Sequence, residues 1–364
     1  MEFKYFNKNQ LERYIHSDQF WKAEYIPIST HRALSQIENP RAKNEDILLI
    51  SAEENGKLLG YIGILPDDIV QENKSAIHFG WFSCLWVDPV LRGRSIGKQL
   101  VNRALEAWND HICITDYTDE ANILYNKTNK FQHDNLNEGI RIYQRFDTAF
   151  ILPSKHNFFR QIKGILKLSD RILNYIADKR YLFYRSDSDK HNFFEVNQID
   201  QGLSDWILDK NTKNKFRRTQ LELNWIREYP WLLMKPENSE SKKYYFSSIS
   251  QYFKNLLVVQ KDSNGEYSDV LMLSIRNSHL KVLYGHLTNP QSTFSFLRQF
   301  VIQNRISTIS IFHPELVLQM KKQFVFCLYK KPISKRFRIS MDLWPFLKDY
   351  LKEIQCGDGD SCFT

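Results

Sequence analysis

Over the first 150 residues, β-rich runs alternate with helix-like patterns of apolar and polar positions. Two apolar runs that meet at Asn55-Gly56 indicate a β-hairpin, because these residues accept the positive φ of a two-residue turn. Ser29 or Thr30 is a suitable N-cap for the helix expected at 29–38. In chain order we expect a strand at 1–6, helices at 9–17 and 29–38, the hairpin at 46–65, a strand at 76–87, a helix at 97–108, a strand at 111–117, a helix at 119–128 and a strand at 138–146.

This order of elements predicts an α/β (α+β) fold with a mixed, mostly antiparallel sheet and helices on both of its faces. The pattern then changes near residue 151. Residues 154–184 carry apolar side chains at helical spacing with lysines and arginines among them. Such a basic amphipathic helix could lie on a membrane, although burying the apolar face against the protein, as a connector across both domains, is the commoner use. Residues 185–192 are polar and predict an exposed loop.

Residues 193–345 end with the same succession of elements as the first 150 residues. β-rich runs are expected at 193–196, 244–249, 255–260, 269–275 and 281–287, followed by a helix at 292–304, a strand at 307–312, a helix from Pro314 and β-rich runs at 324–331 and 336–340. We therefore expect two tandem domains, at 1–150 and 193–364, joined by a helical connector at 151–192. The length of 364 residues agrees, since domains of roughly 100 to 200 residues predict two.

Composition excludes some classes of protein. Neither a signal-peptide run at the start nor about 18 consecutive apolar residues occur, so we expect a cytoplasmic protein without a membrane span. The five cysteines have no metal-ligand spacing, so we expect reduced thiols and no metal. The net charge of +8 is spread over faces that also carry 42 acidic residues, and no nucleic-acid-binding motif is present. Residues 357–361, GDGDS, resemble the start of a calcium loop that has no later glutamate, so a docked or flexible tail is expected.

Residues 85–105 join a strand, a basic turn and a helix. Gly93 and Gly97 let the backbone turn sharply and approach a ligand closely. The helix that follows points its unpaired amides back at the turn, which together with nearby cations forms an anion site suited to a pyrophosphate. An ordinary connection with solvated arginines is the alternative. The cations are Arg92, Arg94 and Lys98.

This turn resembles motif A of the GNAT acyltransferases, in which an arginine or glutamine and two glycines hold fixed positions. Arg92, Ser95 and Gly97 take those positions here, so a serine replaces the middle glycine and reaches positive φ less easily. The resemblance implies that the turn binds the pyrophosphate of coenzyme A and that the preceding strand binds its pantetheine arm. The residues implied are Leu85, Trp86, Val87, Arg92, Gly93, Arg94, Ser95, Ile96, Gly97 and Lys98.

Residues 112–131 are similar to motif B of the same family. Ala121, Leu124 and Tyr125 keep the family spacing. Asn129 takes a position usually held by glycine, a tolerable change because asparagine also adopts the left-handed conformation. Thr118 stands where the family usually has asparagine, and by resemblance it lies at the cofactor. The resemblance further implies that Tyr125 protonates the leaving thiolate, with packing beneath the cofactor as the alternative.

Together the two motifs cover about residues 1–147 and imply an acetyl-coenzyme A dependent N-acetyltransferase of GNAT fold. A primary amine of a small molecule or a protein would attack the thioester directly, with backbone amides near residues 85–87 stabilising the oxyanion. A general base is needed because an ammonium is not a nucleophile, and His78, Asp116 or a chain of waters are candidates. The alternative is a catalytically inactive acyl-coenzyme A sensor or binding module.

The C-terminal half resembles a degenerate second GNAT copy. Its counterpart of the basic turn is residues 287–294, LTNPQSTF, which contain neither a glycine nor an arginine. We therefore expect one cofactor per chain. The aromatic and basic stretch at 215–232 could contact the acceptor, or it could be a packed helix that ends at Pro230.

Overall fold

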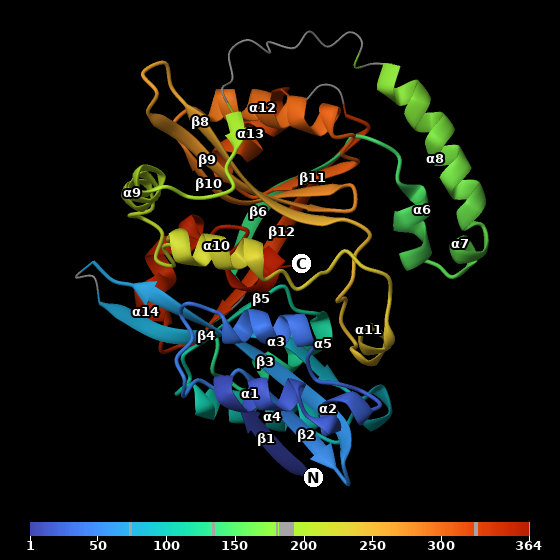
Figure 1. Ribbon diagram of the computed structural model, residues 1–364, viewed down its shortest axis with the longest axis vertical. Helices are drawn as coiled ribbons and strands as arrows, with labels where there is room; N and C mark the ends of the chain where they lie inside the picture. The colour runs from blue at the N-terminus through green and yellow to red at the C-terminus, as the bar shows by residue number, and fades with distance from the viewer. Residues whose placement is uncertain (73–74, 133–134, 180, 182–192, 324–326, 364) are drawn as a thin grey trace. The chain divides into compact units, whose positions relative to one another are not determined.

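The computed structural model describes residues 1–72, 75–132, 135–179, 181, 193–323 and 327–363 (Figure 1). They divide into two compact units that each combine several stretches of the chain. The first unit comprises Met1–Asn137, Asn197–Asn255 and Lys335–Thr364, and the second comprises Glu138–Val196 and Leu256–Ser334. The domain limits expected at 150 and 193 stay a prediction, because a unit defined by contacts can combine strands from two sequence repeats.

The sheet of the first unit is mostly antiparallel. Its strands are, in spatial order, β1 (Glu2–Phe6), β2 (Leu49–Glu54), β3 (Lys57–Val70), β4 (Ala76–Val87), β5 (Ile112–Thr115) and the end of β12 (Tyr329–Ile339). Among the described pairs of this sheet, β4 and β5 run parallel and the others antiparallel. The hairpin between β2 and β3 confirms the expected turn, with φ of 51° at Asn55 and 76° at Gly56.

Helices cover both faces of this sheet because successive strand residues point to opposite sides. On one face, α1 (Lys8–Ile15), α2 (Asp18–Lys22) and α3 (Thr30–Ile37) pack against Leu49, Tyr61 and Trp86. On the other, α4 (Ile96–Ala107) and α5 (Asp119–Asn126) pack against Ile62, Ile64 and Phe82. Ser29 is the N-cap of α3, as predicted.

The first unit also contains chain from the second half of the sequence. This part comprises α9 (Gln201–Lys210), α10 (Gln220–Glu228), α11 (Ser239–Lys243), α14 (Trp344–Leu347) and 3-10 turns at Lys348–Glu353 and Gly359–Phe363. The β-rich run expected at 244–249 is wrong, since only Ile249 forms an isolated bridge there. Tyr244 and Phe246 instead pack their rings against Tyr61, which takes this segment out of a strand.

The sheet of the second unit has its own core. In spatial order its strands are β6 (Asn135–Tyr143), β11 (Thr308–Ile311), β10 (His279–Leu287), β9 (Tyr267–Arg276), β8 (Phe253–Lys261) and β7 (Phe193–Glu195). Its helices include α12 (Pro290–Gln303) and α13 (Pro314–Gln323), whose apolar side chains pack on the sheet. A further group of helices, α6 (Thr148–Ile151), α7 (Phe158–Gln161) and α8 (Lys163–Asp178), belongs to this unit.

The two units repeat one order of elements, as the sequence predicted. The series β2, β3, β4, α4, β5, α5 recurs as β8, β9, β10, α12, β11, α13, and β10 and β11 form a parallel pair like β4 and β5. The last strand of each series is exchanged. The strand after α5, β6, pairs with β11, whereas the strand after α13, β12, pairs with β5. Within the described residues no helix is long and apolar enough to cross a membrane.

Candidate active site

The parallel strands β4 and β5 diverge at one end. Their ladder runs from Gly80–Ile112 to Phe82–Ile114, and no later pair between them occurs in the described part of the chain, although β4 continues to Val87. A bulge accompanies the divergence, since Cys84 has a φ of 50° and the register with β3 shifts there. Trp86 is buried, and its neighbours Leu85 and Val87 are half-buried. The predicted arm-binding residues therefore lie where β4 leaves β5.

The basic turn follows directly and has the left-handed backbone that a phosphate cradle needs. Gly93 has a φ of 93° and Ser95 has a φ of 60°. Ser95 is the N-cap of α4, yet its side chain makes no capping hydrogen bond. The first amides of α4 have no intrahelical partners by geometry, so they stay free for an anion. A Cβ on Gly97 would lie 3.3 Å from Leu124 and 3.5 Å from Val87, so glycine here lets α4 pack closely on the sheet.

The cations of this turn are exposed. Arg92 and Lys98 face solvent, and Arg94, also exposed, lies 3.9 Å from Glu54. Exposed charges at a helix N-terminus add to the helix dipole. The free amides, the left-handed backbone and the cations fit a pyrophosphate, so these residues suit coenzyme A. Ile96, in contrast, is buried in the core beneath α4 and contributes packing.

Tyr125 lies on α5 with its ring buried. It packs edge-on against Tyr117 and Phe131, with ring centroids 5.8 Å and 5.9 Å away. Burial, and secondarily the negative charge of Asp360, raise the pKa of Tyr125, so the phenol keeps its proton at neutral pH. Thr118 is the N-cap of this helix and accepts a hydrogen bond from the Ala121 amide at 3.3 Å. Thr118 thus stabilises the helix that positions Tyr125.

The C-terminal segment, 355–363, docks beside these strands, which settles the choice left open for GDGDS. Gly359, with a φ of 79°, comes so close to β5 that a Cβ there would lie 3.0 Å from Thr115 Oγ1. Thr115 Oγ1 also donates to Asp360 Oδ1, at 3.4 Å. Burial and the nearby charge of Asp116 raise the pKa of Asp360, against the effect of Arg32 and Lys335. Asp360 is therefore a carboxylate within electrostatic reach of Tyr125.

Buried polar contacts hold this C-terminal segment in place. Lys335 Nζ donates to the Cys356 carbonyl at 2.8 Å and to Ser361 Oγ at 2.7 Å. Ser361 Oγ donates in turn to Asp116 Oδ2 at 2.9 Å. The ring of Phe363 stacks on Trp231, with centroids 4.7 Å apart. Sequence patterns give no signal for this docking, because the partners lie far away along the chain.

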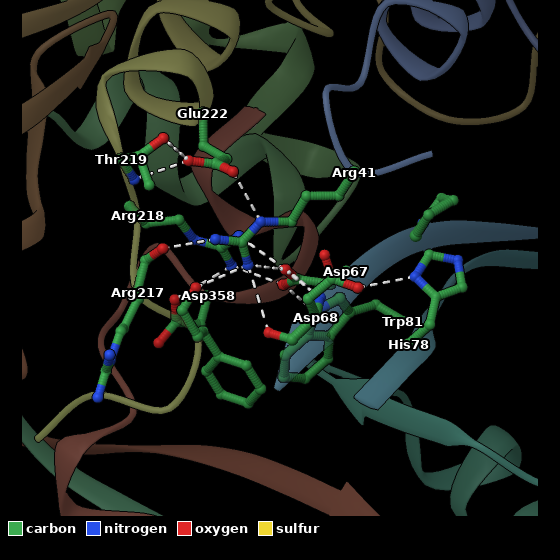
Figure 2. Close-up of polar contacts among 12 residues, drawn as sticks. Arg41, Asp67, Asp68, His78, Trp81, Arg217, Arg218, Thr219, Glu222 and Asp358 are labelled. Carbon is green, nitrogen blue, oxygen red and sulfur yellow. Dashed lines mark hydrogen bonds and ion pairs between the residues drawn. The ribbon is translucent and has the colours of Figure 1, made fainter. Parts of the chain in front are cut away.

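A buried ion network supports the same segment (Figure 2). Arg218 donates to both carboxylate oxygens of Asp67, at 2.9 Å and 2.7 Å, and to Asp358 at 3.3 Å. Arg41 donates to Asp67 and, at 2.8 Å, to Glu222. Burial alone would raise the pKa of Asp67, but the two guanidinium groups outweigh it and lower the pKa to about 2. The network thus joins β3, the chain before α10 and the C-terminal segment.

This network decides between the two interpretations of residues 215–232. Arg218 is buried in it, and Trp225 is buried on α10, where its indole donates to the Ser35 carbonyl at 2.7 Å. These side chains are packing residues, so the packed helix is confirmed.

His78 does not suit the role of general base. Its Nδ1 lies 2.8 Å from Asp68 Oδ1 (Figure 2). Its Nε2 lies 2.9 Å from Asp46 Oδ2. Burial lowers the pKa of His78, but the hydrogen bonds to the two carboxylates outweigh it and raise the pKa to about 9. The imidazole is therefore protonated at neutral pH and cannot accept another proton. Asp360, the carboxylate next to Thr115, was not among the candidate bases that the sequence suggested.

The second unit fills its own counterpart of the cradle. The carboxylate of Asp269, fully buried, accepts hydrogen bonds at 3.0 Å from the amides of Thr288 and Asn289, just before α12. The Asn289 side chain caps the helix by accepting from the Ser292 amide, also at 3.0 Å. An internal carboxylate thus occupies the place that an anion takes at a free helix N-terminus.

The strand order, the diverging parallel pair and the glycine turn before α4 define an acyltransferase-type fold. Residues 14–126 match the family model of the acetyltransferase (GNAT) family, so this segment is a GNAT acetyltransferase domain. No curated protein matches the chain. Among the described residues, no group of three histidine, cysteine or carboxylate side chains is arranged to hold a metal ion.

Solved structures resemble this chain over nearly its whole length. A conserved protein of unknown function from Enterococcus faecalis V583, described as a probable N-acyltransferase, is 11% identical with a TM-score of 0.53, over 95% of this chain and 74% of that one. A GCN5-related N-acetyltransferase from Kribbella flavida is 12% identical with a TM-score of 0.46, over 93% and 70%. Eis1 from Mycobacterium abscessus is 10% identical with a TM-score of 0.44, over 93% and 74%. The first of these similarities shows the fold alone.

Proposed function

We propose that this chain is an N-acetyltransferase that transfers an acetyl group from acetyl-coenzyme A to a primary amine. One observation carries the proposal above the others. The phenol of Tyr125 lies within electrostatic reach of the Asp360 carboxylate, which accepts a hydrogen bond from Thr115 Oγ1 at the end of β5. Leu124, next to Tyr125 on α5, lies close to Gly97 at the uncapped N-terminus of α4. A proton donor, a proton acceptor and an anion site are thus gathered at one end of two strands.

The cofactor residues divide into two groups by what they offer. The turn at 92–98 offers free amides and cations, which suit the pyrophosphate. The backbone of residues 85–87 lies beyond the last β4–β5 pair, which leaves it available to the pantetheine arm. Acetyl-coenzyme A bound there would supply the acetyl group as a thioester, and residues of the chain would transfer the protons.

Two residues of this chain would move protons. Asp360 takes a proton from the ammonium group, because only the neutral amine is a nucleophile. The amine nitrogen then bonds to the acetyl carbon while the carbon–sulfur bond breaks. Tyr125 gives its proton to the departing sulfur, and the attacking nitrogen then returns its second proton to the Tyr125 oxygen, which leaves a neutral amide and a free thiol. Its raised pKa keeps that proton in place at neutral pH, and the raised pKa of Asp360 makes it a stronger base than an exposed aspartate.

Thiol release from acetyl-coenzyme A in the presence of pooled primary amines tests the proposal. We expect turnover with at least one pool. Tyr125→Phe should lower kcat by about 10- to 1,000-fold with cofactor affinity unchanged, since only a proton transfer in the transition state is lost.

The alternative, an inactive acyl-coenzyme A sensor, makes a different prediction for the same samples. Acetyl-coenzyme A would then raise the melting temperature, as ligands of the folded state do, without thiol release from any pool. Equal turnover of the wild type and Tyr125→Phe would leave Tyr125 as a packing residue.

A further inference from the structure

Arg32 is a buried cation that forms no ion pair with a carboxylate among the residues that the structure describes. It lies on α3 with 3% of its surface exposed, and its guanidinium carbon sits 3.5 Å from the centre of the Trp231 ring. Nη1 donates to the Tyr244 hydroxyl at 2.9 Å. Nη2 is buried and, within the described residues, has no hydrogen-bond partner. An unpaired buried charge is costly, so this arrangement is typical of a site that binds an anion.

Other buried polar atoms near Arg32 also have no hydrogen-bond partner in the described part of the chain. They are Gln36 Oε1, Tyr61 Oη, Ser83 Oγ and Trp86 Nε1. The ring of Tyr61 lies 5.5 Å from that of Trp86 and 6.2 Å from that of Tyr244, the partner of Arg32. Ser83 and Gln36 lie together, since a Cβ on Gly63 would be 2.8 Å from Ser83 Oγ and 3.8 Å from Gln36 Nε2. Buried polar groups of folded proteins are normally satisfied, so several orphaned atoms on one face indicate a place for a polar ligand.

The groups around Arg32 do not neutralise it. Burial raises the pKa of the Cys84 thiol and of the Tyr61 and Tyr244 phenols, so all three are neutral at neutral pH. Asp360 is within electrostatic reach of the guanidinium but forms no ion pair with it among the described residues. Cys84 is also the bulge residue of β4, so Arg32 lies on the α3 side of the same divergence.

We propose that the amine acceptor carries a carboxylate, and that Arg32 binds this carboxylate while the amine faces Asp360. The proposal rests on the function proposed above and names the class of its acceptor. Aromatic rings around Trp86 would contact the apolar body of such a molecule. They are Tyr25, Tyr61 and Tyr245, with centroids 6.3 Å, 5.5 Å and 5.8 Å from Trp86.

Matched pairs of aromatic amines that differ by a carboxylate test this acceptor class. Tyrosine is compared with tyramine, and 4-(aminomethyl)benzoate with benzylamine. For at least one pair we expect kcat/KM to be tenfold or more higher for the acid, the size of a lost hydrogen bond to a charge. Arg32→Gln should abolish that ratio, and Arg32→Lys should restore part of it. The melting shift caused by coenzyme A should be unchanged in both variants, which also shows that they fold.

The outcomes separate this inference from the proposed function. Turnover without preference for the acids, or a preference that survives Arg32→Gln, would overturn the carboxylate site. Either result would still support the proposed N-acetyltransferase function. If no amine turns over, melting shifts with 4-(aminomethyl)benzoate and coenzyme A together still decide. A shift that is lost in Arg32→Gln supports the anion site, and no shift in the wild type rejects it.

A second inference concerns the exposed surface of α8 and rests on observations that are independent of Arg32. Apolar side chains spaced by three and four residues form one face of this helix and point into solvent. Their exposed fractions are 67% for Ile165, 57% for Leu168, 54% for Ile172, 70% for Tyr175 and 60% for Ile176. The apolar face that a connector would bury is exposed. The helical connector across both domains stays a prediction.

The polar face of α8 is the buried one. Asp170 accepts hydrogen bonds from Thr148 Oγ1 at 2.7 Å and from the Ala149 amide at 2.9 Å. Asn174 exchanges two hydrogen bonds of 2.8 Å with the backbone of Phe146. These contacts fix α8 through its polar side, which reverses the usual orientation of an amphipathic helix on a protein. The apolar face is thus held outward.

The exposed charge beside this face is positive. Lys163, Lys167 and Arg171 are exposed on α8. Its two acidic side chains are used internally, Asp170 as above and Asp178 in an ion pair of 2.6 Å with Arg145. An apolar face flanked by cations complements the acyl chains and headgroups of an anionic bilayer. We infer that α8 binds the surface of an anionic membrane, lying flat with its apolar face in the lipid.

Flotation with vesicles tests this inference on the full chain. The wild type should float with vesicles of phosphatidylcholine and phosphatidylserine, and less at high salt or without phosphatidylserine. Ile172→Glu with Ile176→Glu should lower the bound fraction at least tenfold, because charges enter the lipid-facing side. Leu221→Glu, a change at a 67% exposed leucine of α10, is the matched control and should float normally.

Two results would overturn the membrane assignment. One is the absence of wild-type flotation with anionic vesicles. The other is a dimer in sedimentation analysis that the double variant dissociates, which would make the face a contact between two copies of this chain.

Discussion

At the scale of single residues, backbone conformation explains the departures from the family motif. Ser95 and Asn129 stand where the family has glycine, and both adopt the left-handed conformation, with φ of 60° and 55°. For Asn129 this confirms the prediction. Ser95 was expected to reach positive φ less easily than glycine, yet its backbone is left-handed, so the serine carries the strain.

Ser95→Gly should therefore stabilise the folded chain. Relief of left-handed strain is worth about 1–2 kcal/mol, against about 0.5–1 kcal/mol for the greater freedom of glycine when unfolded. We expect a net gain of about 0 to 1.5 kcal/mol in the free energy of unfolding, measured by urea denaturation. Ser169→Gly, inside α8, is the control and should destabilise. A loss of stability in Ser95→Gly would contradict the strain at this position.

Asp360 makes a prediction about pH. A general base must be ionised to accept a proton. Because burial raises the pKa of Asp360, acidification should protonate it, and lower the activity, at a higher pH than it would for an exposed aspartate. In the pH profile of kcat/KM we expect an acidic limb that Asp360→Asn removes together with most of the activity. An unchanged limb in Asp360→Asn would assign it to another group.

At the scale of elements, periodicity predicted the segments that are long and amphipathic. The strand at 76–87 and the helices α3 and α4 lie within one residue of their expected limits. Short helices such as α2 and α11, of five residues each, give too few positions for a period to emerge. The exchange of β6 and β12 was not predictable either, because a strand's pattern sets which side faces the core and not which neighbour it joins.

The docked C-terminal segment illustrates the same limit for the site. The motifs predicted Tyr125 and the turn, whose residues are close together in sequence. Asp360 depends instead on contacts between distant residues, among them the pair of Arg218 and Asp358. Single-sequence patterns do not carry such pairings.

Arg218 should therefore be critical for the segment that carries Asp360. Arg218→Leu leaves the buried carboxylates of Asp67 and Asp358 short of a partner, which typically costs about 3–5 kcal/mol. We expect that loss in urea denaturation, together with faster proteolysis near the C-terminus. Arg217→Leu is the matched control, because that side chain donates to the Thr212 carbonyl, and it should change stability by less. Equal losses would show that the network does not hold the segment.

At the scale of the whole molecule, two similar folds divide their roles through one structural difference. The N-terminus of α4 is uncapped by Ser95, whereas the N-terminus of α12 is capped by Asn289, and the amides before it are bound by Asp269. A helix terminus already satisfied by a carboxylate offers nothing to a second pyrophosphate. The repeat thus keeps the fold and, in our proposal, leaves cofactor binding to the first copy.

Titration calorimetry should accordingly find one coenzyme A per chain. Arg92→Glu and Lys98→Glu should each abolish the binding heat, because each reverses the charge of an exposed cation at the anion site. Both variants should keep the melting temperature of the unliganded chain within a few degrees, which excludes unfolding as the cause. Asp269→Asn should leave the stoichiometry at one, because the first cradle is untouched. Two binding sites in the wild type, or one site that survives both changes in the turn, would place coenzyme A elsewhere.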